Sequence, residues 1–201
     1  AKGILFAIVT ARYWIGAERY IDLLKPDYEI TTDGTLIHSL GQCIYSCRFS
    51  VSETNRIVHS IAKTVPGTEI TVAYEKTVYW NSRHITESEK LHKAIYCDYT
   101  ASLEVEANKI VAELPDEAVA RQIADQANCK LQCYRGERWY AFLPTGSGKT
   151  EAIKALSETS KISLADTVAF GDDQNDIEML KLCGNGIAVA NAVPEVLEIA
   201  D

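Results

Sequence analysis

The sequence has no long hydrophobic run and is short of positive charge. No apolar stretch in the 201 residues reaches the roughly 18–20 residues needed to cross a bilayer, and no secretion-signal pattern opens the chain. Twenty Lys and Arg residues stand against 28 Asp and Glu, so the formal net charge is -8. This deficit argues against nucleic acid or an anionic membrane as the main partner. It does not exclude a small anionic substrate, because a site can be locally positive.

The cysteines lack a spacing typical of zinc sites. Cys43 and Cys47, like Cys129 and Cys133, are spaced C-x3-C, whereas zinc sites more often use C-x2-C or C-x4-C. Both pairs lie in strand-like segments, where residues four apart point to the same face about 13 Å from each other. We therefore expect reduced thiols in a cytoplasmic protein, in preference to a four-cysteine metal site. Nothing in the sequence indicates an oligomeric state.

Three short apolar runs share one pattern: Leu5–Val9, Thr167–Phe170 and Gly186–Ala190. None of them alternates between apolar and polar residues, which is typical of parallel strands buried on both faces. A helical pattern follows each run. Repetition of strand, loop and helix predicts an α/β fold with a Rossmann-like parallel sheet.

The middle of the chain has a different organisation. Short strand-like segments alternate there with two helical patterns, one that we expect Ser52 to cap and one over Asp116–Ala127. We predict that residues 48–140 form an α+β cap domain inserted into the α/β core. The core would then be discontinuous, built from residues 1–47 and 141–201.

The segment Gly148-Lys149-Thr150 looks like the end of a nucleotide-binding loop. Such a loop needs another glycine five residues before Gly148, and Leu143 stands there. What remains is a lysine in the first turn of a helix. A solvated lysine is one interpretation; the other is that the helix terminus and the ammonium group together attract an anion.

The acidic segment GDDQND is the most informative. Asp172 and Asp173 follow a predicted buried strand, and Asn175 and Asp176 come as a helix begins. Ligands of α/β sheets bind at the carboxyl ends of strands. Helix capping explains one aspartate well but three poorly, because the three repel one another unless a cation or N–H groups neutralise them. One or two carboxylates with water and phosphate suit Mg²⁺, so we predict a magnesium site at Asp172 and Asp176.

A third segment, Val9–Arg12, ends the first predicted strand. Its Thr10 hydroxyl and backbone amides could hold a phosphate oxygen, but the pattern Thr-Ala is common and weak by itself. Taken in order, Thr10 with Arg12, then Lys149, then GDDQND resemble the second, third and fourth motifs of the haloacid dehalogenase-like phosphatases. The resemblance covers almost the whole chain. Within the family, the sequence most resembles the Cof-type group, which has a large inserted cap.

The resemblance implies a role for each matching residue. Asp172 would bind Mg²⁺ directly, and Asp176 would support the ion. Lys149 would balance the charge between nucleophile and phosphoryl group, which makes Lys149 and Thr10 the expected catalytic residues. Phosphate and substrate contacts are expected from Thr10, Ala11, Arg12, Lys149 and Asn175.

One motif of that family does not occur in the sequence. The family's first motif, Asp-x-Asp-Gly-Thr, supplies the aspartate that attacks phosphorus, and it belongs to a strand between those that carry the second and fourth motifs. Asp33-Gly34-Thr35 is the only Asp-Gly-Thr here, and Thr31 replaces the first aspartate. We interpret Asp33 as a turn residue and expect the nucleophile to lie upstream of Ala1. On that interpretation the 201 residues alone would lack activity, and two apolar strand edges would be exposed.

The function that we expect is a Mg²⁺-dependent phosphatase acting on a small phosphorylated metabolite, such as a sugar phosphate or a phosphorylated cofactor precursor. Catalysis would pass through an aspartyl-phosphate. The alternatives are a nucleoside triphosphatase or kinase that uses Lys149, and a non-catalytic relative that binds phosphorylated metabolites. Candidate substrate contacts in the cap are Tyr74, Trp80, Arg83 and His84.

Overall fold

The computed structural model describes residues 3–82 and 94–200. These residues fall into two compact units, and the division lies between Ser147 and Gly148. Each unit is described by itself. This division differs from the predicted one, in which a cap interrupts a core, so the core and cap boundaries stay a prediction. The candidate cap residues Arg83 and His84 lie outside the described residues.

The first unit begins with a small mixed sheet. Strand β1 (Ala7–Val9) pairs in parallel with β2 (Tyr28–Thr31), and helix α1 (Trp14–Leu24) connects the two. The next strands, β3 (Leu36–Ser39) and β4 (Gln42–Ser46), continue the sheet in antiparallel order. The parallel pair joined by a helix confirms the strand–helix–strand pattern predicted for this end of the chain.

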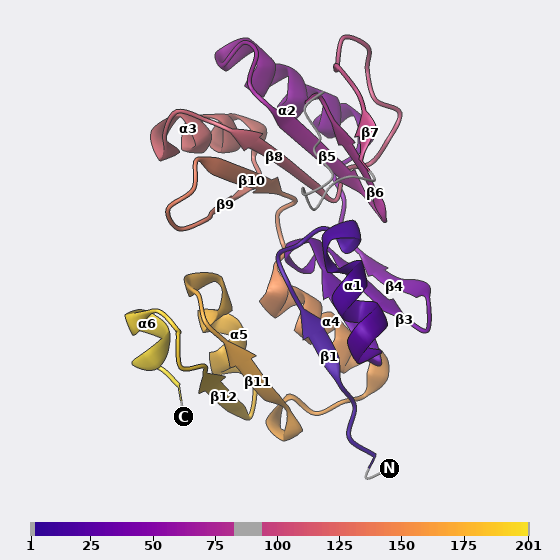
Figure 1. Cartoon of the computed structure of the whole chain (residues 1–201), viewed down its shortest axis with the longest axis vertical. Helices are drawn as coiled ribbons and strands as arrows, with labels where there is room; N and C mark the ends of the chain where they lie inside the picture. The colour runs from indigo at the N-terminus through magenta and orange to yellow at the C-terminus, as the bar shows by residue number, and fades with distance from the viewer. Residues whose placement is uncertain (1–2, 83–93, 201) are drawn as a thin grey trace. The chain divides into compact units, whose positions relative to one another are not determined.

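The rest of the first unit is an α+β lobe built on a six-stranded sheet in the order β7-β6-β5-β8-β10-β9. Figure 1 shows its two helices, α2 (Val51–Thr64) and α3 (Glu117–Ala127), which also contact each other. All neighbouring strands are antiparallel except β6 and β7. The strands are β5 (Ile70–Tyr74), β6 (Thr77–Trp80), β7 (Ile95–Tyr96), β8 (Lys109–Glu113), β9 (Lys130–Cys133) and β10 (Trp139–Leu143).

This lobe has a hydrophobic core of its own. Ile57 and Ile61 of α2 and Ile123 of α3 pack with strand residues such as Ile110 and Phe142, and all five are at most 1% exposed. Apolar residues three or four apart on each helix place one face against the sheet. A separate core within residues 49–142 is what an inserted domain requires.

Helix α2 begins two residues earlier than predicted. Its cap is Ser50, because the Ser50 side chain accepts a hydrogen bond from the Glu53 amide at 3.3 Å. Glu53 in turn accepts from the Ser50 amide at 2.8 Å. This reciprocal capping box satisfies two N–H groups of the first turn, whereas the predicted cap, Ser52, lies inside the helix.

The second unit contains the other parallel pair. Strands β11 (Val168–Gly171) and β12 (Asn185–Ala188) are parallel, and helix α5 (Ile177–Leu182) lies between them in sequence. The unit begins with α4 (Lys149–Ser160) and its last helix is α6 (Pro194–Leu197). With the first unit, these elements confirm an α/β fold that carries parallel strands and an added α+β lobe.

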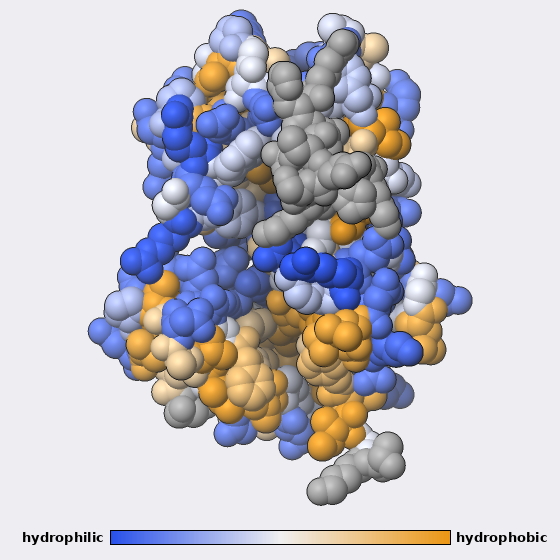
Figure 2. Space-filling model, in the orientation of Figure 1, coloured by the Kyte–Doolittle hydropathy of each residue, from blue (hydrophilic) through white to orange (hydrophobic). Residues whose placement is uncertain are grey.

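Strands β1 and β11 are both at the edge of their sheets, and both leave apolar side chains exposed. Leu5 and Phe6, just before β1, are 53% and 46% exposed; Val168 and Phe170 of β11 are 52% and 62% exposed. Figure 2 shows apolar surface over each segment. The expected burial of these strands on both faces is therefore wrong for the described residues, whereas the expected exposure of two apolar edges is confirmed.

Among the described residues, no helix combines the length and the apolar character needed to cross a bilayer. The six cysteines all have free thiols. Burial raises the pKa of the Cys129 thiol to about 11 and shifts that of Cys133 in the same direction. Both groups therefore stay protonated near neutral pH and are poor nucleophiles.

Candidate active site

Asp176 organises the acidic loop after β11. It is 5% exposed, and its Oδ2 accepts hydrogen bonds from the backbone amides of Asp172 at 3.1 Å and Asp173 at 3.3 Å. Asp173 caps the short 3-10 turn Gln174–Asp176 through the amide of Gln174. One buried carboxylate therefore fixes the loop that the sequence singles out.

Lys149 contacts the same carboxylate. Its Nζ lies 2.6 Å from Asp176 Oδ1 and 3.0 Å from Asn175 Oδ1, and the Lys149 and Asp176 side chains are 9% and 7% exposed. A lysine in the first turn opposes the dipole of α4, and the adjacent carboxylate offsets that cost. Three residues predicted for the site, Lys149, Asn175 and Asp176, thus meet within one unit. The solvated-lysine interpretation is wrong.

Gly171 allows this close approach. A Cβ atom added at Gly171 would lie 2.6 Å from the Cβ of Asp176, a distance that real side chains do not adopt. The last residue of β11 therefore has to be glycine for Asp176 to fold back against the strand end. The sequence showed the glycine but not this steric reason for it.

Asp172 is the residue best placed to bind a cation. Its side chain is exposed, and none of the described residues forms a hydrogen bond with its carboxylate. Both oxygens of Asp176 are already occupied, so Asp176 fits an indirect, supporting role. The described residues contain no cluster of three or more His, Cys, Asp or Glu side chains that could enclose a metal. This donor set fits Mg²⁺, which commonly takes one or two carboxylates and completes its shell with water and substrate phosphate.

The Thr10–Arg12 segment belongs to the first unit, where β2 and the turn after it fix its backbone. The Thr10 amide donates to the Ile30 carbonyl at 2.9 Å, and the Arg12 carbonyl accepts from the Thr32 amide at 2.7 Å. The Arg12 amide donates to Thr10 Oγ1 at 3.2 Å. The Thr10 O–H and the Ala11 N–H have no acceptor among the described residues. These two donors are free to bind the oxygens of an anion.

Two further features favour an anion at this segment. Helix α1 starts at Trp14, two residues after Arg12, and its N-cap Tyr13 makes no side-chain capping bond. A helix N-terminus attracts negative charge through its unpaired N–H groups. The Arg12 side chain is exposed, and its guanidinium carbon lies 5.9 Å from the centre of the Tyr20 ring.

Sequence reasoning missed a second buried lysine–aspartate pair, between Lys109 and Asp33. Asp33 does lie in a turn, as predicted, but it has a positive φ of 56° itself and its side chain is 5% exposed. Lys109 Nζ lies 2.5 Å from Asp33 Oδ2. A signal existed: Lys109 opens the apolar run Lys109-Ile110-Val111-Ala112, and a lysine in a buried strand needs a partner.

Comparison with known proteins decides the family. The model of the haloacid dehalogenase-like hydrolase family matches residues 1–201, the whole chain. The chain belongs to the haloacid dehalogenase-like hydrolases. The family and the expected hydrolase class are thereby confirmed, and the match does not favour the nucleoside triphosphatase alternative.

Individual relatives agree with this assignment. The chain is 46% identical to YkrA of Bacillus subtilis (strain 168) over 68 residues, which is 32% of this chain and 26% of YkrA. It is 43% identical to the HMP-PP phosphatase of Cronobacter sakazakii (strain ATCC BAA-894) over 65 residues, 32% of this chain and 24% of that protein. These matches span about a quarter of each relative. The solved structure of BT4131, a HAD subclass IIB sugar phosphatase, superposes with a TM-score of 0.82 at 18% identity, covering 100% of this chain and 79% of BT4131.

Proposed function

We propose that this protein is a Mg²⁺-dependent phosphatase that hydrolyses small phosphate monoesters. The observation that carries the proposal is the buried contact of Lys149 with Asp176 and Asn175. These two residues belong to the loop of Asp172, whose exposed carboxylate has no hydrogen-bond partner among the described residues. A carboxylate available to a cation, in a loop that a fixed ammonium group anchors, suits a phosphoryl group, because catalysis of phosphoryl transfer depends mainly on positioning and neutralising its oxygens.

Each residue of the proposed site has a distinct task. Asp172 would hold Mg²⁺, which supplies positive charge that polarises the phosphoryl oxygens. Asp176 would keep Lys149 and the loop amides in place, and Lys149 would neutralise charge that builds up on the phosphoryl group. The Thr10 hydroxyl and Ala11 amide would donate to phosphate oxygens, because neither has an acceptor among residues 3–82 and 94–200.

The chemical route remains part of the proposal. The family resemblance implies attack by an aspartate, which gives an aspartyl-phosphate that water then cleaves. The motif Asp-x-Asp-Gly-Thr does not occur among the 201 residues, so this route needs an aspartate from outside them. Leaving-group selection would fall to the α+β lobe within residues 48–140.

The substrate class is a small phosphorylated metabolite in the cytoplasm. Two relatives support it: one is named a phosphatase of HMP-PP and the other a sugar phosphatase. A net charge of -8 disfavours polyanionic substrates and leaves a small ester, bound at a local cluster of donors, as the better fit.

A substrate panel tests the proposal. The natural full-length protein and the 201-residue chain would be incubated with Mg²⁺ and sugar phosphates, phosphorylated cofactor precursors, p-nitrophenyl phosphate and ATP, and inorganic phosphate release would be measured. We expect the full-length protein to release phosphate from monoesters faster than from ATP. Hydrolysis confined to ATP would favour a triphosphatase, and phosphate-ester binding without turnover would favour a non-catalytic relative.

A further inference from the structure

The Lys109–Asp33 pair links two parts of the first unit. Lys109 belongs to β8 of the six-stranded sheet, and Asp33 lies in the turn between β2 and β3 of the small sheet. Both side chains are 5% exposed, and the Tyr134 hydroxyl donates to the same Asp33 oxygen at 2.7 Å. Burial, with the Asp33 charge as a lesser cause, raises the pKa of Tyr134, so Tyr134 stays protonated and remains a donor.

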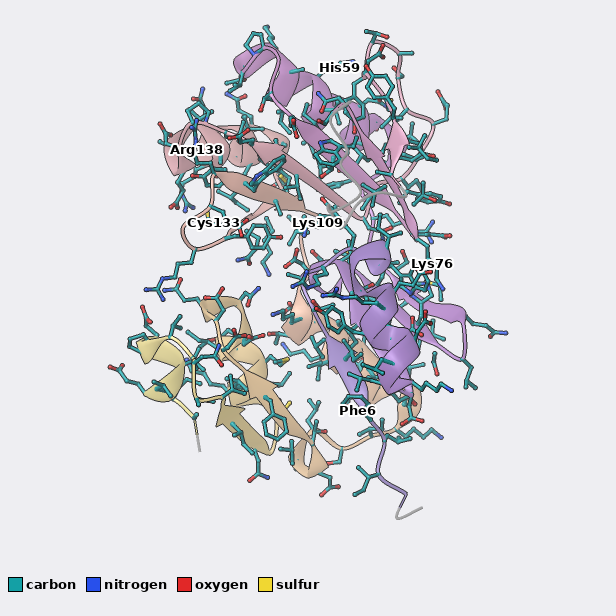
Figure 3. All side chains as sticks on the ribbon, in the orientation of Figure 1. Phe6, His59, Lys76, Lys109, Cys133 and Arg138 are labelled. Carbon is teal, nitrogen blue, oxygen red and sulfur yellow. The ribbon has the colours of Figure 1, made fainter. Side chains whose placement is uncertain are left out.

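Lys109 has a third contact, with the backbone of the candidate phosphate-binding segment. Figure 3 labels Lys109, whose Nζ donates to the Ala11 carbonyl at 3.0 Å. That carbonyl shares one planar peptide with the Arg12 N–H, and in a trans peptide the two groups point in opposite directions. By holding the carbonyl, Lys109 fixes the direction of the Arg12 N–H.

The Arg12 N–H donates to Thr10 Oγ1. Because the Thr10 oxygen accepts this bond, its own O–H is oriented away from Arg12 and remains available as a donor. The chain of contacts therefore runs from Asp33 through Lys109 and the Ala11–Arg12 peptide to the Thr10 hydroxyl.

We propose that Lys109, held by Asp33, is a positioning residue that orients Thr10 and the Ala11–Arg12 peptide for phosphate. This inference rests on the proposed phosphatase function and deepens it. Lys109 acts through the peptide and does not touch the reacting group.

The turn that carries Asp33 supports a functional role. Thr32 and Asp33 have φ values of 57° and 56°, a region that residues other than glycine rarely adopt. The Thr32 amide donates to the Arg12 carbonyl, so this unusual turn contacts the segment as well. Strained backbone of this kind tends to persist at functional sites, where surrounding contacts enforce it.

The test separates positioning from simple structural support. Replacing only one partner of a buried pair leaves an uncompensated charge and destabilises the fold, whereas replacing both is often nearly neutral. The variants are therefore Lys109→Met, Asp33→Asn and the double variant Asp33→Asn/Lys109→Met in the natural full-length protein. Thr71→Val is the matched control, because Thr71 Oγ1 lies 2.6 Å from the Tyr13 hydroxyl in the same region but is not hydrogen-bonded to Ala11.

Three quantities are measured: kcat and KM for two esters with different leaving groups, the affinity for inorganic phosphate by calorimetry, and the melting temperature. We expect the double variant to melt near the wild-type temperature, yet to lose about 10²-fold in kcat for both esters, since small misplacements in a site have effects of that size. Its phosphate affinity falls as well, and Thr71→Val retains wild-type kcat.

Two results overturn the inference while leaving the function intact. The first is a double variant in which both kcat and the melting temperature return to wild-type values. That result would show that the pair has only a structural role. The second is a change in KM for one ester only, which makes Lys109 a leaving-group contact. A wild-type protein that neither cleaves the esters nor binds phosphate instead contradicts the proposed function, and the inference fails with it.

Discussion

Lys149 with Asp176 and Lys109 with Asp33 are two buried ion pairs of almost equal length, at 2.6 and 2.5 Å, one in each unit. Their surroundings differ. Asp176 also accepts hydrogen bonds from two backbone amides of its own loop, so that pair is tied to the five-residue segment Asp172–Asp176. Asp33 accepts from a tyrosine 101 residues away, and Lys109 reaches back 98 residues to Ala11. The first pair organises a local loop, whereas the second connects distant parts of a unit.

This difference gives each pair its own expected effect. Loss of the local pair would disturb the loop that carries Asp172, and hence the chemistry. Loss of the distant pair would first weaken the packing of β8 against the turn at Asp33, and would reach the chemistry only through the Ala11 carbonyl. The two pairs can therefore be separated by comparing stability with turnover.

The largest expected effect is on stability, in Lys109→Met. Removing the ammonium leaves the Asp33 carboxylate buried, with the Tyr134 hydroxyl as its one remaining hydrogen-bond partner in the described part of the chain. We expect the free energy of unfolding to fall by about 3–5 kcal/mol, the usual effect of breaking a buried pair. Urea denaturation followed by circular dichroism measures it. Lys76→Met, which removes a lysine from the turn between β5 and β6 of the same sheet, is the control. An equal loss of stability in both variants would contradict a special role for the buried pair.

The next effect is on turnover, in Lys149→Met. We expect kcat/KM to fall by about 10²–10³-fold, as for removal of a donor that stabilises developing charge. Phosphate release by the natural full-length protein measures it. Lys154→Met, an exposed position on the same helix α4, serves as the control. Wild-type kcat/KM in Lys149→Met would remove Lys149 from the mechanism.

A smaller effect is expected from Gly171→Ala. The added methyl group overlaps Asp176, so we expect about 1–3 kcal/mol of destabilisation and a shift of the Lys149 contact. Urea denaturation and kcat together report both consequences. Gly16→Ala adds the same methyl group on α1, where the nearest atom outside the helix backbone is 3.9 Å away. If Gly171→Ala behaved like Gly16→Ala, the close approach of Asp176 to the strand end would be wrong.

The smallest effect belongs to Ser50→Ala, which lies away from both pairs. Loss of the Ser50 hydroxyl removes its hydrogen bonds with the amide and the carboxylate of Glu53 in the first turn of α2. We expect about 1 kcal/mol of destabilisation with unchanged kcat. Ser52→Ala is the matched control, since Ser52 lies inside the helix. Equal destabilisation by the two substitutions would contradict the assignment of the cap to Ser50.

The sequence predicted both members of the local pair as site residues, though not their contact, and missed the distant pair for a physical reason. Lys149 opens a helix and Asp176 ends a dense acidic segment, so each is conspicuous in its own neighbourhood. Lys109 and Asp33 are ordinary in theirs, and the packing of β8 against the turn between β2 and β3 brings them together. The glycine at 171 was visible, but its purpose depends on where Asp176 folds.

For secondary structure too, features set by neighbouring residues were predicted better than features set by tertiary packing. The helix over Glu117–Ala127 was predicted almost to the residue, because Asp116 caps it and its apolar positions have helical spacing. The cap of α2 was assigned to Ser52 in place of Ser50, because serine is a favourable cap residue at either position. Burial of β1 and β11 on two faces was predicted wrongly. An apolar run indicates that a strand favours burial, but it does not show which other elements pack against that strand.

Magnesium dependence tests the central claim most directly. Phosphate release by the natural full-length protein would be titrated with Mg²⁺ after treatment with a chelator, for the wild type and for Asp172→Asn, with Asp166→Asn as a control outside the loop. The account predicts that the chelator abolishes activity, that Mg²⁺ restores it in the wild type and the control, and that Asp172→Asn responds weakly or not at all. Phosphate release that does not depend on Mg²⁺ would contradict the account. An Asp172→Asn variant whose activity responds to Mg²⁺ as the wild type does would contradict it as well.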